Sequence, residues 1–333
     1  MANLITDDDI DFAMYEATTD AQQKVRAASL YVQELIDRAS APRRERNALM
    51  PWTKTHGLIQ FRRGEVTVWG GPNGSGKSLV TGQVGLSLCA QDEKVCIASF
   101  EMKPTKTLNR MGRQWTGFSL DDSQVMGDPT ERAIVLDHYA QFRDWTDGKL
   151  WLYDHQGTVA WKQVCAVARY AARELGVEHF FVDNLMKCVA GEDDYNGQKA
   201  FVDELCSVAR EEDIHVHLVH HIKKPVSDDH LPTKYDFKGT GAITDQPDNV
   251  IAVWRNKTKE RQRQANKAVA DTEPDTKLIV DKQRNGEGWE GVIGLWYEPR
   301  SQQYLAGHNL KPMTFYAAPQ DAIPMDEPFI CAD

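Results

Sequence analysis

A glycine-rich run at residues 71–78 has the residue types that bind the phosphates of a nucleotide. It reads Gly71-Pro72-Asn73-Gly74-Ser75-Gly76-Lys77-Ser78 and fits the pattern G-x-x-x-x-G-K-[ST]. Its glycines allow several backbone N–H groups to face one anion, and the start of the following helix adds partial positive charge. Lys77 is expected to reach the β- and γ-phosphates, and the Ser78 hydroxyl is expected to ligate Mg²⁺. The sequence therefore predicts a nucleoside triphosphate site.

The segments on either side of this run fit that function. The preceding residues 65–69 are typical of a buried strand, and Val80, Val84 and Leu88 recur every four residues, as on one face of a helix. A glycine-rich turn without a phosphate is the alternative interpretation. The strand before the run and the helix after it argue against that alternative.

Two carboxylates and a histidine follow other apolar strands. Glu101, Asp183 and His221 each stand at or just after the end of a predicted strand. Because ligands gather at the carboxyl ends of strands in open α/β sheets, we expect these side chains to converge on the glycine-rich run. Asp183 fits a magnesium-binding Walker B acid, and Glu101 fits a general base for the attacking water. An Asp that merely caps a strand and a surface Glu are the alternatives.

Strands and helices alternate along most of the chain, which predicts an α/β fold with a mostly parallel sheet covered by helices on both faces. The expected strands are 65–69, 95–99, 150–153, 179–183, 214–219, 250–254, 278–281 and 292–296, and the expected helices are 20–39, 77–91, 105–116, 131–142, 161–175 and 199–212. Residues 117–129 are expected to form a loop, and residues 259–275 an exposed charged excursion between two strands.

Composition limits the class of protein. The 333 residues suffice for one well-buried domain with appendages, and no apolar run reaches the length of a membrane span. We therefore expect a cytoplasmic protein with no membrane contact. The net charge of −10 argues against broad coating of nucleic acid but leaves room for a narrow basic channel. The six cysteines lack C-x-x-C spacing and are expected to be buried, reduced thiols.

Several short motifs follow the glycine-rich run along the chain. They are Ser99-Phe100-Glu101-Met102, Val182-Asp183-Asn184-Leu185, His217-Leu218-Val219-His220-His221, Asp236-Phe237-Lys238-Gly239-Thr240-Gly241-Ala242, Asp248-Asn249-Val250-Ile251, Trp254-Arg255-Asn256 and Lys282-Gln283-Arg284-Asn285-Gly286. In these motifs and their order, the chain resembles DnaB-type replicative helicases from about residue 52 to 306. The resemblance is greatest to Twinkle, the mitochondrial helicase, and to the helicase half of T-odd phage primase-helicases. It implies a RecA-like P-loop NTPase core.

The resemblance also implies a role for each matched residue. Lys77, Ser78 and Asp183 would hold the triphosphate and Mg²⁺, with ATP or dTTP as the nucleotide. Glu101 would be the catalytic carboxylate. His221 would sense the γ-phosphate and couple its hydrolysis to a DNA-binding loop.

Other matched residues concern the subunit boundary. Arg284 matches an arginine finger that enters the neighbouring subunit's site, and Lys282 is expected to assist it. Arg255 and Tyr297 match the pair that sandwiches the nucleotide base. An arginine that acts in trans requires a ring, so the resemblance implies a homo-hexamer. Residues 244–245 depart from the arginine and glutamine of phage relatives, which leaves the second coupling element in doubt.

DNA is expected to meet the loops that line the central channel in relatives. The residues that supply phosphate-neutralising charge or backbone N–H groups there are Lys223, Lys224, Lys234, Lys238 and Gly239. A solvated basic loop is the alternative for each lysine. The family implies translocation on single-stranded DNA in the 5′ to 3′ direction.

The chain divides into three expected parts. Residues 1–45 would form a flexible acidic arm and a linker helix, residues 46–310 the helicase domain, and residues 311–333 an acidic tail. The linker helix would pack on a neighbouring subunit or on its own domain. The tail would dock a replisome partner such as DNA polymerase, or it would be inert. A separate primase and a single-strand-binding protein are further expected partners.

Two other functions remain open from sequence. A RecA-like recombinase or recombination mediator would form filaments, and a helicase-loader-type regulatory ATPase would hydrolyse nucleotide weakly. His215, His217 and His221 share one face of a predicted strand, which raises the possibility of a metal site. The absence of accompanying cysteines or carboxylates argues against it.

Overall fold

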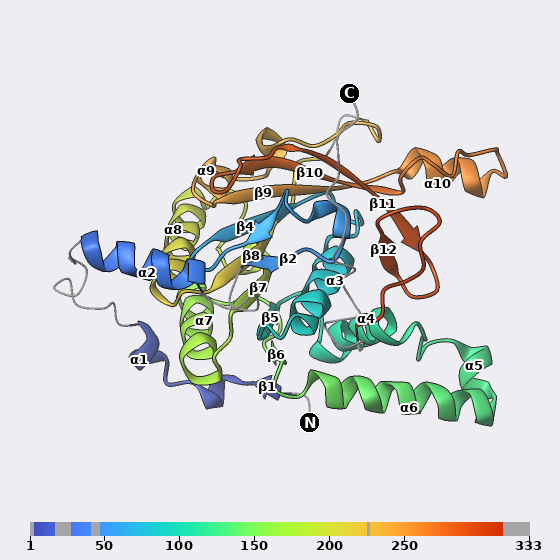
Figure 1. Ribbon diagram of the computed structural model, residues 1–333, viewed down its shortest axis with the longest axis horizontal. Helices are drawn as coiled ribbons and strands as arrows, with labels where there is room; N and C mark the ends of the chain where they lie inside the picture. Colours follow the sequence, from blue (N-terminus) through green and yellow to red (C-terminus); the bar gives the residue numbers. More distant parts are fainter. Residues whose placement is uncertain (1–2, 17–27, 41–46, 225–226, 316–333) are drawn as a thin grey trace.

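A ten-stranded sheet runs through the centre of the computed structural model, which describes residues 3–16, 28–40, 47–224 and 227–315 (Figure 1). Its strand order is β1-β6-β5-β7-β8-β4-β9-β10-β11-β12. The strands are β1 (Asn3–Ile5), β4 (Val66–Gly70), β5 (Val95–Ser99), β6 (Leu150–Tyr153), β7 (His179–Asp183), β8 (His215–Val219), β9 (Asn249–Arg255), β10 (Thr276–Gln283), β11 (Gly291–Glu298) and β12 (Gln303–Leu305). The short strands β2 (Ala48–Leu49) and β3 (Gln60–Phe61) pair separately.

Helices cover both faces of the sheet, as predicted. The described helices are α1 (Phe12–Glu16), α2 (Ala28–Ser40), α3 (Lys77–Ala90), α4 (Pro104–Thr116), α5 (Ser123–Gly127), α6 (Pro129–Thr146), α7 (Trp161–Leu175), α8 (Tyr195–Glu211), α9 (Ala242–Asp245) and α10 (Lys257–Gln264). One hydrophobic core lies between the sheet and α7 and α8, and the other lies between the sheet and α3, α4 and α6. The five cysteines of the described segments are buried and free, as expected, and Cys331 lies outside them.

The parallel strands β1, β6, β5, β7, β8, β4 and β9 bring their carboxyl ends to one edge of the sheet. Strand β4 lies between β8 and β9, with Trp69 opposite Val219 and Ile251. Strand β5 lies beside β7, with Ser99 opposite Asp183. Strands β10, β11 and β12 extend the sheet in antiparallel fashion. The loops that follow β4, β5, β7 and β8 therefore meet at the same edge.

Local sequence signals fix the helix that follows β5. Helix α4 starts with Pro104 at its first position, where the missing N–H costs nothing, and ends at Gly117 with a left-handed φ of 76°. Its buried side chains include Met111 and Trp115. The helix therefore begins three residues after Glu101, close to the edge of the sheet at which the carboxyl ends of the parallel strands lie.

The first segment of the chain differs from the prediction of a flexible arm. Strand β1 pairs in parallel with β6, and Ile5, Ile10 and Tyr15 are buried in the core beside α7. The Tyr15 hydroxyl donates a hydrogen bond to Glu174 Oε1 at 2.7 Å. The apolar residues between the acidic ones give residues 3–16 enough buried surface to order them. The predicted helix 20–39 is described only from Ala28, as α2.

Two further segments differ from their predictions. The expected loop 117–129 contains α5, whose N-cap residue Asp122 accepts hydrogen bonds from Gln124 N and Val125 N. The expected charged excursion 259–275 begins inside α10, and Lys259 within it is buried rather than solvated. Lys259 Nζ lies 2.8 Å from Asp275 Oδ1, and this ion pair offsets the cost of burying the ammonium group.

Candidate active site

The glycine-rich loop joins β4 to α3, as predicted. Lys77 Nζ donates hydrogen bonds to Gly71 O at 2.8 Å and to Pro72 O at 3.0 Å, so the ammonium group lies under the loop. Burial lowers the pKa of Lys77 to about 8, while the charges of Asp183 and Glu101 act in the opposite direction. The loop therefore holds a buried cation, which is the group a phosphate needs.

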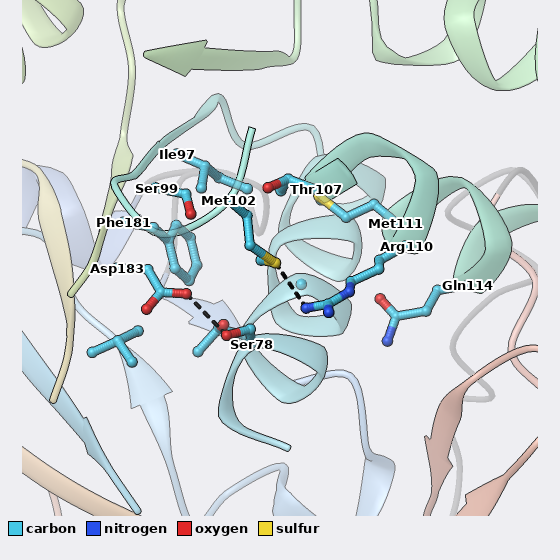
Figure 2. A pocket seen from close by; sticks show the side chains of 13 residues that line it. Ser78, Ile97, Ser99, Met102, Thr107, Arg110, Met111, Gln114, Phe181 and Asp183 are labelled. Carbon is cyan, nitrogen blue, oxygen red and sulfur yellow. Dashed lines mark hydrogen bonds between the residues drawn. The ribbon is translucent and has the colours of Figure 1, made fainter. Parts of the chain in front are cut away.

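Ser78 and Asp183 form the oxygen-bearing wall of a cavity (Figure 2). Ser78 Oγ donates a hydrogen bond to Asp183 Oδ2 at 2.9 Å. Burial raises the pKa of Asp183, and the Ser78 hydrogen bond opposes this shift. A hydroxyl and a carboxylate at this separation suit Mg²⁺, which prefers oxygen ligands and often takes only one or two from the protein.

Glu101, Asn184 and His221 are linked at the ends of three strands. Asn184 Nδ2 donates to Glu101 Oε1 at 2.5 Å and lies 2.9 Å from His221 Nε2. Because the amide nitrogen can only donate, this contact makes Nε2 of His221 the acceptor and assigns the imidazole proton to Nδ1. Burial lowers the pKa of His221, while Glu101 acts in the opposite direction. Asn184 therefore fixes the carboxylate and the imidazole relative to each other.

The residues expected to hold the base lie beside the loop. Arg255 Nη1 donates a hydrogen bond to Gly74 O at 3.1 Å. The Tyr297 ring lies 5.5 Å from the Tyr304 ring, and a Cβ atom at Gly76 would overlap the Tyr304 hydroxyl. Gly76 also has a φ of 90°, so both space and backbone conformation require glycine there. Arg255 and Tyr297 thus flank one end of the loop.

Arg284 and Lys282 are not part of this group. Arg284 N donates to Asp248 O, and Asp248 N donates to Val66 O, which places Arg284 at the amino end of β4. Its guanidinium lies 3.1 Å from Asp248 Oδ1 and is partly exposed. Lys282 Nζ donates to backbone carbonyls of residues 244, 245 and 247. The glycine-rich loop starts at the other end of β4.

The expected DNA-contacting residues have different surroundings. Lys223 and Lys224 are exposed, and Lys234 is half-buried. Lys238 Nζ lies 2.6 Å from Glu192 Oε1, and Lys238 N donates to His221 O at 3.2 Å. The segment around Lys238 is therefore attached directly to the end of β8.

Buried Gln198 holds the next part of that loop. Its Oε1 accepts a hydrogen bond from Thr240 N at 3.0 Å, and its Nε2 donates to Gly191 O and Glu192 O. Gly239 has a φ of 84°, and a Cβ atom there would overlap Gln198 Oε1. A side chain at residue 239 would not fit beside Gln198, which explains why glycine occurs there.

The histidines of β8 belong to the core. His215 and His217 are fully buried, and burial lowers the pKa of His215 to about 3. His215 Nε2 lies 2.8 Å from Thr67 Oγ1, and Trp69 Nε1 donates to His217 Nδ1. No group of three or more His, Cys, Asp or Glu suited to a metal occurs in the described residues.

One known protein family matches most of the chain. Residues 54–305 match the family described as the DnaB-like helicase C-terminal domain. The chain belongs to this family. It therefore contains a DnaB-like replicative helicase domain, and such a domain implies an NTP-dependent helicase. None of the helices in the described residues has the length and apolar character needed to span a bilayer.

Two solved structures share the RecA-like ATPase fold of this DnaB-like domain. One, described as an ATPase domain, superposes with a TM-score of 0.68 at 16% identity, and the match covers 89% of this chain and 100% of the other. The second, a DnaB-like replicative helicase described with its interactions with primase, gives a TM-score of 0.70 at 14% identity, and the match covers 85% of this chain and 69% of the other. These likenesses establish the fold.

Sequence reasoning missed two residues of the site. Asn184 follows Asp183 directly and belongs to the matched motif at residues 182–185, but the sequence assigned no role to it. Tyr304 lies on β12, far along the chain from the loop it contacts, and no local pattern marks it. Trp52 Nε1 and Gln83 Nε2 both donate to the backbone carbonyl of Tyr304, so long-range contacts hold the backbone at this residue.

Proposed function

We propose that this protein is a ring-forming, NTP-hydrolysing replicative helicase that translocates 5′ to 3′ on single-stranded DNA and unwinds duplex DNA. The observation that carries the proposal is the separation of Arg284 from the glycine-rich loop within one subunit. Strand β4 spans four residue steps from Val66 to Gly70, about 13 Å, between the two. An arginine at that position would serve catalysis only from a neighbouring subunit, which supports sites shared between subunits. The closed ring of six follows from membership of the DnaB-like family.

Within one subunit the proposed roles follow the contacts. Lys77 and the loop 71–78 bind the triphosphate of ATP or dTTP, and Ser78 and Asp183 hold Mg²⁺, which neutralises charge on the phosphates. Glu101 accepts a proton from the attacking water. Asn184 orients that carboxylate. Arg255 and Tyr297 hold the base.

Between subunits, Arg284 stabilises charge on the transferring phosphoryl group of the neighbour, and Lys282 assists it. Helix α2 supports the same assembly because Val32 and Ile36 on it are exposed in the single chain, with 53% and 52% of their surfaces accessible. These side chains suit packing on an adjacent subunit. The proposed linker helix extends to residue 20, outside the described residues.

Single-stranded DNA contacts the loop that holds Lys238 and Gly239 and the segment with Lys223, Lys224 and Lys234. The bond between Lys238 N and His221 O supports coupling, because a shift of His221 on hydrolysis moves this loop. The proposed partners are a separate primase, a single-strand-binding protein and DNA polymerase, the last through the acidic tail. Within the expected tail 311–333, Phe315 is buried in the core and Met313 packs against it, and residues 316–333 lie outside the described residues.

Electron microscopy of the protein with a non-hydrolysable nucleotide and a single-stranded oligonucleotide tests the assembly. Closed six-membered rings are expected, with Arg284 of one subunit facing Lys77 of the next. Open helical filaments would instead support the recombinase alternative. A forked-duplex unwinding assay completes the test, because a regulatory ATPase would form rings without unwinding.

A further inference from the structure

Arg110 faces the cavity bordered by Ser78 and Asp183. It belongs to α4, and Figure 2 shows its guanidinium extending from that helix toward the space in front of Ser78. Met102, in the loop after β5, points its sulfur atom toward this guanidinium. The positive charge of this exposed side chain therefore borders the same cavity as Ser78 and Asp183.

Buried contacts hold α4 in this position. Gln114 Nε2 donates hydrogen bonds to Leu79 O at 2.9 Å and to Gln302 O at 3.0 Å, and Gln114 is almost fully buried. Leu79 directly follows Ser78 in the first turn of α3. Arg110 lies four residues before Gln114 and so shares its helix face. The anchor that fixes Gln114 beside α3 also fixes Arg110 beside the cavity.

The guanidinium of Arg110 has free hydrogen-bonding capacity. Its one hydrogen bond to another part of the described chain is from Nη1 to Met102 Sδ at 2.8 Å, and a thioether is a weak acceptor. Its charge favours the ionised form of Asp183 and lowers the pKa of that carboxyl, against the larger opposite effect of burial. The remaining N–H groups of Arg110 are available to an anion other than the Asp183 carboxylate, and their planar arrangement matches phosphate oxygens.

We propose that Arg110 is an additional substrate-binding residue, which contacts the terminal phosphate of the bound triphosphate from within the same subunit. The positions of Arg110 and of the expected base-binding residues, at opposite ends of the site, indicate which phosphate Arg110 contacts. Arg255 and Tyr297 flank the loop at Gly74 and Gly76, where the base would lie, whereas Arg110 borders Ser78 and Asp183. A cation beside Ser78 and Asp183 contacts the γ-phosphate, which a diphosphate lacks. It therefore distinguishes a triphosphate from a diphosphate. This inference rests on the proposed triphosphate site.

Nucleotide binding by the full chain, without DNA, tests this role. Affinities for fluorescent ATP and ADP analogues with Mg²⁺ are compared for wild type, Arg110→Ala and Arg110→Lys. The loss of a charge-assisted hydrogen bond is expected to weaken ATP binding about tenfold, with ADP binding unchanged. Arg110→Lys should recover part of the loss, because lysine restores the charge but not the planar fork. Lys106→Ala, an exposed change one turn earlier on α4, is the matched control.

Equal losses for ATP and ADP, no loss in either variant, or the same loss in Lys106→Ala would each overturn the role of Arg110. Wild-type protein that binds neither nucleotide would instead refute the triphosphate site itself. Thermal unfolding checks the fold of every variant. If Arg110→Ala does not fold, Arg110→Gln takes its place in the same comparison.

Discussion

Arg284 and Lys77 stand at opposite ends of strand β4. Arg284 is bonded to Asp248 beside the first residue of the strand, whereas Lys77 follows the loop that starts after its last residue. A single subunit therefore keeps these two side chains apart by the length of β4. In the proposed ring, the arginine of one subunit would face the lysine of the next.

Replacement of Arg284 is expected to abolish catalysis without abolishing nucleotide binding. Arg284→Ala should lower DNA-stimulated hydrolysis by about a thousandfold or more, the usual contribution of an arginine finger, while nucleotide binding persists. Steady-state hydrolysis and equilibrium binding measure the two effects. Arg261→Ala, an exposed arginine on α10, is the matched control.

Mixing two inactive variants shows whether Arg284 acts in the nucleotide site of its own subunit or in that of a neighbouring subunit. In a ring that combines Arg284→Ala subunits with Lys77→Ala subunits, some boundaries pair an intact lysine with an intact arginine. Partial recovery of hydrolysis is therefore expected. Absence of any recovery in rings shown to be mixed would assign Arg284 to its own subunit and contradict the assembly.

Glu101→Gln is expected to bind nucleotide and DNA but to stall. General-base catalysis contributes about 10²- to 10⁴-fold, so hydrolysis should fall by that factor. Asn184→Ala should cause a smaller loss, because the carboxylate remains but loses the donor at 2.5 Å. Single-turnover hydrolysis measures both. Glu131→Gln on α6 controls for the loss of one surface charge, and a stalled Glu131→Gln would refute the assignment.

The depressed pKa of Lys77 predicts a pH dependence of binding. In the free protein this lysine is cationic below about pH 8 and loses its proton above that value. A bound triphosphate favours the charged form, so binding above pH 8 must take up a proton. Affinity should then decrease by up to about tenfold per pH unit between pH 8 and 10. Calorimetry in two buffers of different ionisation enthalpy measures the proton uptake on nucleotide binding. Absence of proton uptake at pH 9 would contradict the depressed pKa of Lys77.

Glu192 is expected to compete with DNA for Lys238. Its carboxylate lies 2.6 Å from Lys238 Nζ, and contact with this lysine lowers its pKa. Glu192→Gln should therefore raise affinity for single-stranded DNA by about two- to fivefold at low salt, as for an exposed ion pair. Asp193→Asn is the matched control for charge. In a Lys238→Met background the gain should vanish, and its persistence there would exclude competition.

The central fold and most of the site follow from local sequence signals. Strand β7 and the acid that ends it are predictable because five residues, His179 to Asp183, form one buried run between polar segments. The parallel arrangement then brings Glu101 and His221 to the same edge. The bounds of α7 are likewise confirmed, because its apolar spacing is regular and Gly176 ends it.

The remaining features depend on contacts between distant segments. Tyr304 reaches Gly76 only because β12 is placed beside α3, and nothing near Tyr304 in the sequence encodes that contact. Helix α5 is too short to show a helical period. The acidic residues of the first segment conceal the apolar ones, Leu4 and Ile5, that join it to the sheet.

The pairing of β1 with β6 has a practical consequence for shortened versions of the protein. Without residues 3–16, β6 would become the outermost strand and would present unpaired N–H and C=O groups to solvent. Apolar side chains on α7 that pack on Tyr15 and Ile10 would be uncovered at the same time. Such an edge invites backbone pairing between molecules. Truncation at residue 17 should therefore promote aggregation, and a terminal tag is better attached at the carboxyl end.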